Sequence, residues 1–123
     1  MLPTENRAAV SGVAHHWIEL ADTSLHYVTA GRAGPLILLV HGFPETWWAF
    51  HELIPLLSED HRVVAVDLRG FGDSATGSGE TGSAVAAEDL HQLIDALDLG
   101  AVHVVGQDIA GATVFRLAAL HPE

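Results

Sequence analysis

The sequence contains no cysteine and few basic residues, and each shortage excludes classes of protein. Without cysteine, the 123-residue chain can form no disulfide, no thiolate nucleophile and no cysteine-based metal site. Only 5 lysine and arginine residues stand against 16 aspartate and glutamate residues, and the formal net charge is -11. A nucleic acid or an anionic membrane surface needs a positively charged face, so we expect neither as a partner. A small organic ligand fits this charge better.

Long apolar runs and cofactor motifs are also missing. No segment is long enough to span a bilayer as a helix, and residues 1–7 lack a basic stretch followed by an apolar core. We therefore expect a cytoplasmic protein with no membrane partner. Neither a glycine-rich dinucleotide motif nor a phosphate-binding loop occurs, and the 9 histidines show no ligand spacing of the HExxH kind. The sequence predicts no cofactor and no metal, with most histidines at surface or half-buried positions.

The sequence does contain apolar segments that alternate with polar and glycine-rich turns along the chain. It is 49% hydrophobic, which is enough for one well-buried domain. We expect a lead-in over residues 1–14 and a single α/β domain over residues 15–123: a mostly parallel sheet with an antiparallel N-terminal hairpin, and helices on both faces. Alternating segments predict the hairpin, continuous apolar runs the buried strands, and helical spacing the helices. The hairpin strands are 16–20 and 25–29, the buried strands 36–40, 62–67 and 102–105, and the helices 46–57, 90–97 and 109–120.

The most informative segment follows the last predicted strand, where the sequence reads GQDIA at residues 106–110. Small residues flanking a nucleophile at this spacing are typical of a nucleophile elbow, in which a strand turns sharply into a helix. Asp108 occupies the nucleophile position, and a carboxylate there attacks alkyl carbon to form an ester with the enzyme. An aspartate at a helix N-terminus can instead act only as a cap, which stabilises by about 1 kcal/mol. We favour the nucleophile, because a strained turn serves no purpose for a cap alone.

A second motif, HGFP at residues 41–44, follows the first buried strand. Its glycine lets the backbone turn outward, and the backbone amides of Phe43 and Ile109 are predicted to form an oxyanion hole. His41, Pro44 and Trp47 are predicted to line a substrate pocket. Taken alone, the segment is also typical of an ordinary strand-to-helix loop with aromatic side chains in the core. The elbow makes the functional interpretation the stronger one.

A third polar segment, DLRGFGDS at residues 67–74, is interpreted as structural. Aspartate side chains readily accept hydrogen bonds from loop amides, and we expect Asp67 and Asp73 to do so, with Arg69 as counter-ion. His103, in the strand before the elbow, is expected to be a satisfied polar group between strand and helix.

Together, HGFPETW at 41–47, DLRGFGDS at 67–74 and GQDIAG at 106–111 resemble the N-terminal half of the α/β-hydrolase superfamily. Within it, the chain is most similar to the branch of epoxide hydrolases and haloalkane dehalogenases, which uses an aspartate nucleophile. The resemblance implies that Asp108 opens an epoxide through an alkyl ester. A histidine-activated water then hydrolyses the ester to a diol, while the amides of Phe43 and Ile109 hold the oxyanion. A haloalkane or haloacid dehalogenase is the alternative, and it is disfavoured because dehalogenases commonly carry a tryptophan where this chain has Ile109.

The resemblance also implies that part of the fold lies beyond these residues. In the family, the histidine base, its acidic partner and the residues that protonate the epoxide follow the nucleophile helix, and this sequence stops at Glu123. We therefore expect an incomplete, catalytically deficient fragment. Val102, Val104 and Val105 would lie on an unpaired edge strand, which is a template for association. A missing C-terminal half or a second copy of the chain would cover this edge, and a non-catalytic half-domain that binds a partner there is a further alternative.

Overall fold

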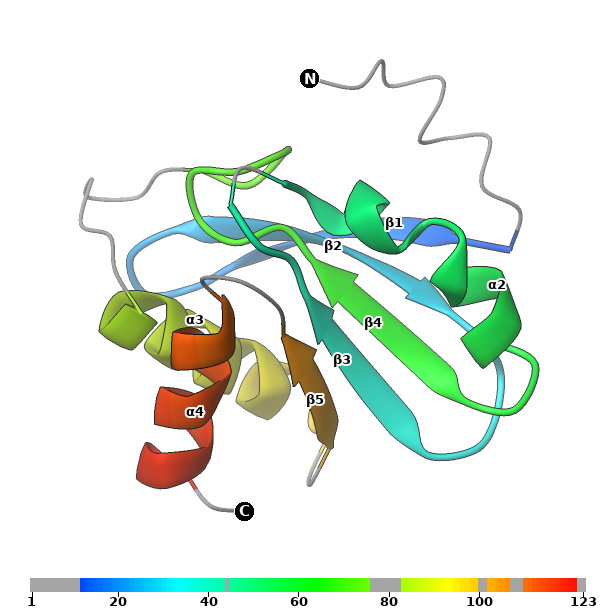
Figure 1. Cartoon of the computed structure of the whole chain (residues 1–123). Helices are drawn as coiled ribbons and strands as arrows, with labels where there is room; N and C mark the ends of the chain where they lie inside the picture. Colours follow the sequence, from blue (N-terminus) through cyan, green and yellow to red (C-terminus); the bar gives the residue numbers. More distant parts are fainter. Residues whose placement is uncertain (1–11, 44, 76–82, 100–101, 107–109, 122–123) are drawn as a thin grey trace.

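Strands and helices alternate along the chain after an initial pair of strands (Figure 1). The computed structural model describes residues 12–43, 45–75, 83–99, 102–106 and 110–121. The strands are β1 (Ala14–Glu19), β2 (Ser24–Ala30), β3 (Leu36–Val40), β4 (Arg62–Val66) and β5 (His103–Gly106). The helices are the 3-10 helix η1 (Trp47–Phe50), α2 (Leu53–Leu57), α3 (Ser83–Ala96) and α4 (Ala110–Leu120). This is the predicted order, except that the first predicted helix is divided.

One mixed sheet contains the described strands, in the order β1-β2-β4-β3-β5. β1 and β2 form the predicted antiparallel hairpin, and β2 continues antiparallel to β4. β4, β3 and β5 run parallel to one another. Because β3 and β4 lie inside the sheet and are covered on both faces, their sequences are continuous apolar runs and do not alternate. β5 is the last strand, so its outer edge pairs with no other strand among the described residues.

Helices cover both faces of the sheet, as predicted (Figure 1). On one face, α3 and α4 pack over a core that includes Leu38, Leu90 and Leu93, all fully buried. On the other face, η1 and α2 contribute Trp47 and Ile54, which are also fully buried. Successive side chains of a strand point to opposite faces, and this divides the apolar residues between the two cores. Within the described ranges, no helix is long and apolar enough to cross a membrane.

The prediction of one continuous helix over residues 46–57 was wrong. The chain forms a single 3-10 turn over η1, where the Thr46 hydroxyl accepts a hydrogen bond from the amide of Trp48, and α2 begins only at Leu53. Pro55 supplies the reason. Inside a continuous helix its ring would clash with the carbonyl four residues earlier, whereas in the first turn of α2 its missing N–H costs nothing.

α4 begins at Ala110, four positions after β5 ends at Gly106, and the helix packs closely on the strand. A Cβ atom on Gly106 would lie 2.6 Å from Cγ2 of Val114 and 3.0 Å from the carbonyl oxygen of Ala110. Ala110 is fully buried. Both positions therefore require small residues, which is the property that the elbow pattern assigns to them.

Candidate active site

The three motifs of the sequence leave the sheet at one edge. In the parallel registers, Val40 at the end of β3 is paired with Val66 of β4 on one side and with Gly106 of β5 on the other. The segments 41–47, 67–74 and 107–109 therefore all start at the carboxyl ends of neighbouring parallel strands. In open α/β sheets this is the edge at which ligands bind.

Asp108, Ile109 and Pro44 lie outside the described residues, so their predicted roles remain predictions. What the structure gives is the frame around Asp108. β5 runs into a three-residue connection, and α4 follows directly, with Gly106 and Ala110 in close contact across it. A strand followed after three residues by a helix that packs closely on it is the context that a nucleophile elbow requires.

His41 begins the loop after β3 and is fully buried. Its Nδ1 donates to the carbonyl of Gly42 at 2.9 Å, and its Nε2 accepts from the amide of Leu68 at 3.0 Å. Burial lowers the pKa of His41, an effect that the Gly42 hydrogen bond and the charges of Asp67 and Glu45 offset only in part. The ring is therefore held neutral, with the proton on Nδ1, as the acceptor role of Nε2 demands.

Trp47 ends the same loop, and it too is fully buried. Its backbone N–H donates to Oδ1 of Asp67 at 2.8 Å. Its indole Nε1 has no hydrogen-bond partner among the described residues, and its ring meets that of His15 edge-on, with centroids 5.6 Å apart. Trp47 and His41 have no exposed surface and support the loop 41–47 from the protein interior. This argues against the predicted direct contact of the two side chains with a substrate.

Phe43, whose amide is the predicted oxyanion donor, lies on the outer side of the loop with 62% of its surface exposed. Its ring contacts Phe71 edge-to-face at 5.9 Å, and Phe71 in turn contacts the ring of His41 at 5.2 Å. The rings of Phe43 and Phe71 form an apolar aromatic surface beside the carboxyl ends of β3 and β4, with the buried ring of His41 beneath Phe71. Such a surface suits a small organic molecule with an apolar group.

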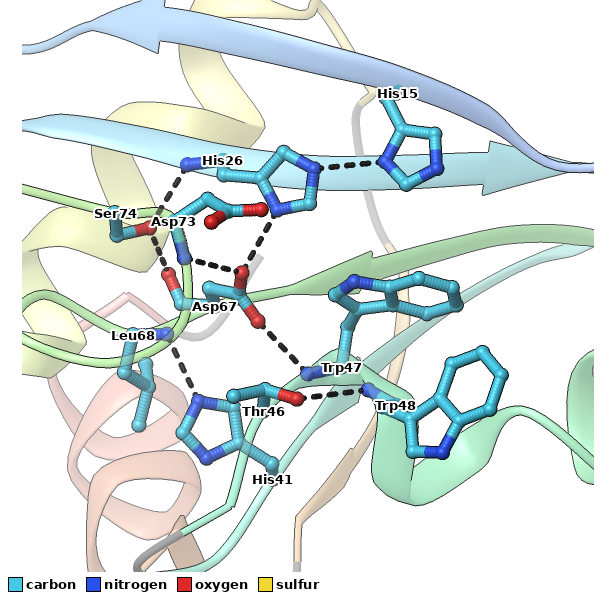
Figure 2. A network of polar contacts seen from close by, with 10 residues as sticks. All are labelled: His15, His26, His41, Thr46, Trp47, Trp48, Asp67, Leu68, Asp73 and Ser74. Carbon is cyan, nitrogen blue, oxygen red and sulfur yellow. Dashed lines mark hydrogen bonds and ion pairs between the residues drawn. The ribbon is translucent and has the colours of Figure 1, made fainter. Parts of the chain in front are cut away.

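Asp67 is the centre of a polar network behind the loop (Figure 2). Its carboxylate is fully buried and accepts from the amides of Trp47 and Asp73, at 2.8 and 3.0 Å. This confirms the prediction that Asp67 binds loop amides. The carboxylate also accepts from Nδ1 of His26 at 2.7 Å, and Nε2 of His26 lies 3.0 Å from Nδ1 of His15.

Sequence reasoning missed His26, which is fully buried although most histidines were expected near the surface. No local spacing signals the contact, because His26 and Asp67 are 41 residues apart. The antiparallel pairing of β2 with β4 brings them together, as the hydrogen bond from the Asp67 amide to the His26 carbonyl at 2.9 Å shows.

The predicted role of Arg69 was wrong. Arg69 is buried and forms a bidentate pair with Asp89 of α3, with distances of 2.7 and 2.8 Å, and a further bond of 2.7 Å to Asp22. The hydrogen bonds to Asp89 raise the pKa of Arg69 above its already high ordinary value. The side chain fastens the loop to α3, because Asp67 already has three donors and needs no guanidinium. His103 also differs from expectation, since it is exposed on β5.

One group in the described part of the chain has the spacing of a metal site: ligand atoms of His26, Asp67 and Asp73 lie within 4.8 Å of one another. A metal would have to replace the bond between His26 and Asp67, because Nδ1 of His26 and Oδ2 of Asp67 already bind each other. The existing bonds satisfy the carboxylate with two amides and an imidazole. We therefore interpret the group as a structural network.

Comparisons with known proteins agree with this architecture. The sequence matches the alpha/beta hydrolase fold family over residues 35–123. It is 38% identical to a soluble epoxide hydrolase of Corynebacterium sp. (strain C12) over 106 residues, which are 86% of this chain and 37% of that protein. It is 33% identical to a fluoroacetate dehalogenase of Burkholderia sp over 117 residues, which are 91% of this chain and 38% of that protein. The crystal structure of epoxide hydrolase VrEH1 from Vigna radiata matches with a TM-score of 0.86 and 31% identity, covering 93% of this chain and 38% of that one.

These matches have two consequences. The chain spans 37% and 38% of the length of the two relatives, and the matches cover 86% and 91% of this chain. The epoxide hydrolase resemblance of the sequence is thus confirmed at the level of the family. This chain belongs to the alpha/beta hydrolase fold family, in the branch that contains the epoxide hydrolases.

Proposed function

We propose that this chain is the nucleophile-bearing part of an epoxide hydrolase, which converts a small organic epoxide to a diol through an ester of Asp108. The observation that carries the proposal is that Val66, Val40 and Gly106 are register partners at the ends of three neighbouring parallel strands. Each of the three motifs includes or directly follows one of these residues, so all three lie at the same edge of the sheet. The similarity to epoxide hydrolases supports the choice of substrate. The aromatic surface at Phe43 and Phe71 supports a substrate with an apolar group.

The reaction proceeds in two displacements. A carboxylate oxygen of Asp108 attacks an epoxide carbon, the ring carbon–oxygen bond breaks, and the ring oxygen takes a proton from an acid. Water then attacks the ester carbonyl and gives a proton to a base. The amides of Phe43 and Ile109 hold the negative charge that develops on the carbonyl oxygen. The bond from the carbonyl carbon to the alkyl oxygen then breaks, and that oxygen takes the proton back from the base and leaves as the diol. The carboxyl group, which now holds one oxygen from water, returns a proton to the acid and is again a carboxylate.

We assign the acid and the base to further polypeptide. His26 and His41 contact the residues directly after β4, and both are fully buried with their ring nitrogens in hydrogen bonds. Neither can activate water without losing those bonds. Tyr27 is buried in β2 and is no candidate for the acid. The relatives, of which this chain spans 37% and 38%, have room for both groups.

The test is a single turnover in water enriched in ¹⁸O. The protein is expressed from its native full-length reading frame and mixed with a smaller molar amount of styrene oxide. Its peptides are then analysed by mass spectrometry. We expect one ¹⁸O in the peptide that contains Asp108 and none in the first diol formed, because the diol oxygen comes from the old carboxylate. Label in the diol alone would show direct attack by water and refute the ester. Halide release from fluoroacetate without diol formation would favour the dehalogenase alternative.

The open edge of β5 supports a second proposal, that further polypeptide covers this edge. Val105 has 45% of its surface exposed, whereas Val104 packs against the core under α3 and α4. The covering segment is either the remainder of a longer protein or a second copy of the chain. We expect Val105→Lys to disrupt a dimer of the 123-residue chain in sedimentation velocity if a second copy covers the edge. A stable monomer whose state is unchanged by Val105→Lys would contradict cover by a second copy and leave the remainder of a longer protein as the covering segment.

A cytoplasmic location and a small organic partner complete the proposal. The formal net charge of -11 supports an uncharged ligand over a nucleic acid, and the absence of cysteine is compatible with a reducing compartment. Cell fractionation of the native source checks the location, and recovery in the membrane fraction would contradict it.

A further inference from the structure

The loop that carries the Phe43 amide is fastened at both ends by two consecutive residues. At its start, the amide of Leu68 donates to Nε2 of His41 at 3.0 Å. At its end, the amide of Trp47 donates to Oδ1 of Asp67 at 2.8 Å. Asp67 and Leu68 follow β4 directly, so the ends of the loop are tied to the neighbouring strand. Figure 2 shows both contacts below Asp67, on the side away from His26 and His15.

Between these two anchors the loop has little freedom of its own. The amide of Glu45 donates to the carbonyl of Gly42 at 2.8 Å, and the amide of Gly42 donates to Oε1 of Glu45 at 3.1 Å. These bonds close a tight turn around Phe43. The direction of the Phe43 amide is therefore set by how the turn as a whole is held, which depends on the anchors at His41 and Trp47.

The anchor at Asp67 is itself held from behind. His26 donates to Oδ2 of Asp67 at 2.7 Å, and the amide of Asp73 donates to the same oxygen at 3.0 Å. Gly72 has φ +53, and a Cβ there would overlap the Asp67 carboxylate. The carboxylate thus has one orientation, fixed from β2 and from the loop after β4.

We propose that Asp67 is a positioning residue for the oxyanion hole, acting through Trp47 on the amide of Phe43. The inference rests on the proposed function and adds which half-reaction the residue serves. When Asp108 attacks the epoxide, negative charge leaves its carboxylate, so a donor at the second oxygen gains nothing in that transition state. When water attacks the ester, charge grows on that oxygen, and a preorganised donor stabilises it. Asp67 therefore acts on ester hydrolysis and not on ester formation.

The experiment measures the two steps separately by rapid quench and intact mass spectrometry, using the full-length protein and styrene oxide. In Asp67→Asn, the amide group cannot accept from all three donors that bind the carboxylate, so the anchor loosens. We expect ester hydrolysis to slow by about 10- to 100-fold, below the about 100- to 1000-fold of a deleted donor. Ester formation is expected to stay within about threefold, so the ester on Asp108 accumulates.

Two controls separate positioning from loss of fold. Leu90→Ala removes a fully buried apolar side chain of α3 that takes part in neither anchoring hydrogen bond, and it is expected to leave the ratio of the two rates unchanged. At the other anchor, His41→Gln keeps an acceptor near the position of Nε2, whereas His41→Leu removes it. We expect the leucine variant to accumulate the ester and the glutamine variant to behave nearly as wild type, and this pair decides the question if Asp67→Asn does not fold.

The outcomes are distinguishable. Wild-type protein that forms an ester on Asp108, combined with variants at Asp67 or His41 that slow both steps equally, would refute the positioning role and leave the proposed function standing. Wild-type protein that turns over without any ester on Asp108 would refute the proposed function, and the positioning role with it. Accumulated ester in Asp67→Asn and His41→Leu, but not in Leu90→Ala, is the expected result.

Discussion

Replacement of Gly106 by alanine tests whether α4 is seated on β5 as the structure shows. The new Cβ would lie 2.6 Å from Cγ2 of Val114 and 3.0 Å from the carbonyl oxygen of Ala110. The Val114 side chain is stiff in a helix, and the Ala110 carbonyl moves only if the helix moves. The contacts therefore force α4 away from the strand at the point where the elbow is predicted.

The magnitude follows from two opposing effects. Overpacking of a close contact costs about 1–3 kcal/mol. Replacing glycine also reduces the entropy of the unfolded chain, which offsets about 0.4–1 kcal/mol. We expect Gly106→Ala to lower the free energy of unfolding by about 1–2 kcal/mol, measured by urea denaturation followed by circular dichroism.

The matched control lies five residues away in the same segment. A Cβ on Gly111 would meet nothing within 4 Å, and Gly111 is an exposed helical residue. Gly111→Ala should therefore stabilise by about 0.5–1 kcal/mol, through helix propensity. In Gly106→Ala combined with Val114→Ala, the loss should be smaller than the sum of the single losses, because one clash is removed. The reasoning fails if Gly106→Ala is as stable as wild type.

Four further predictions concern the segments around Asp67 and Arg69. Burial lowers the pKa of His41 in the folded chain, so the unfolded chain binds a proton first as the pH falls below about 6.5. The free energy of unfolding therefore drops below that pH by up to about 1.4 kcal/mol per pH unit. Urea titrations at several pH values should show a smaller decrease of the free energy of unfolding with falling pH for His41→Gln. Asp89→Asn should cost about 3 kcal/mol or more in thermal or urea unfolding, since it leaves the Arg69 guanidinium buried without its bidentate partner. Asp22→Asn, at a half-exposed partner of the same arginine, should cost about 1 kcal/mol or less, and equal losses would contradict the assigned geometry. Gly72→Ala should cost about 2 kcal/mol or more, from its positive φ and its overlap with the Asp67 carboxylate; an unchanged urea midpoint would refute this.

Much of the fold follows from the periodicity of the sequence. The continuous runs at 36–40 and 62–66 are β3 and β4, because strands covered on both faces have no polar side to display. The break in the predicted helix over 46–57 is also open to prediction, since Pro55 lies in the last turn of that range, where its ring would clash with the carbonyl of His51. At this position the backbone constraint of proline overrides the apolar spacing that predicts one helix.

The candidate site divides in the same way. The elbow pattern and the HGFP motif are local, so their spacing alone predicts Asp108 as nucleophile and the amides of Phe43 and Ile109 as donors. The partners of the supporting charges are not local. The nearest aspartates in the sequence predict Asp67 and Asp73 as the partners of Arg69, whereas the fold gives it Asp89 on α3.

The sequence by itself determined the α/β class, the order of the elements and the resemblance to epoxide hydrolases, because burial patterns and turn residues are local properties of a chain. Only the tertiary structure decided that β2 lies beside β4 and that His26 therefore meets Asp67 across 41 residues. It also decided that the loop 41–47 is fastened at both ends to the residues after β4. The lateral order of strands depends on how the whole chain crosses over, and no local pattern records it.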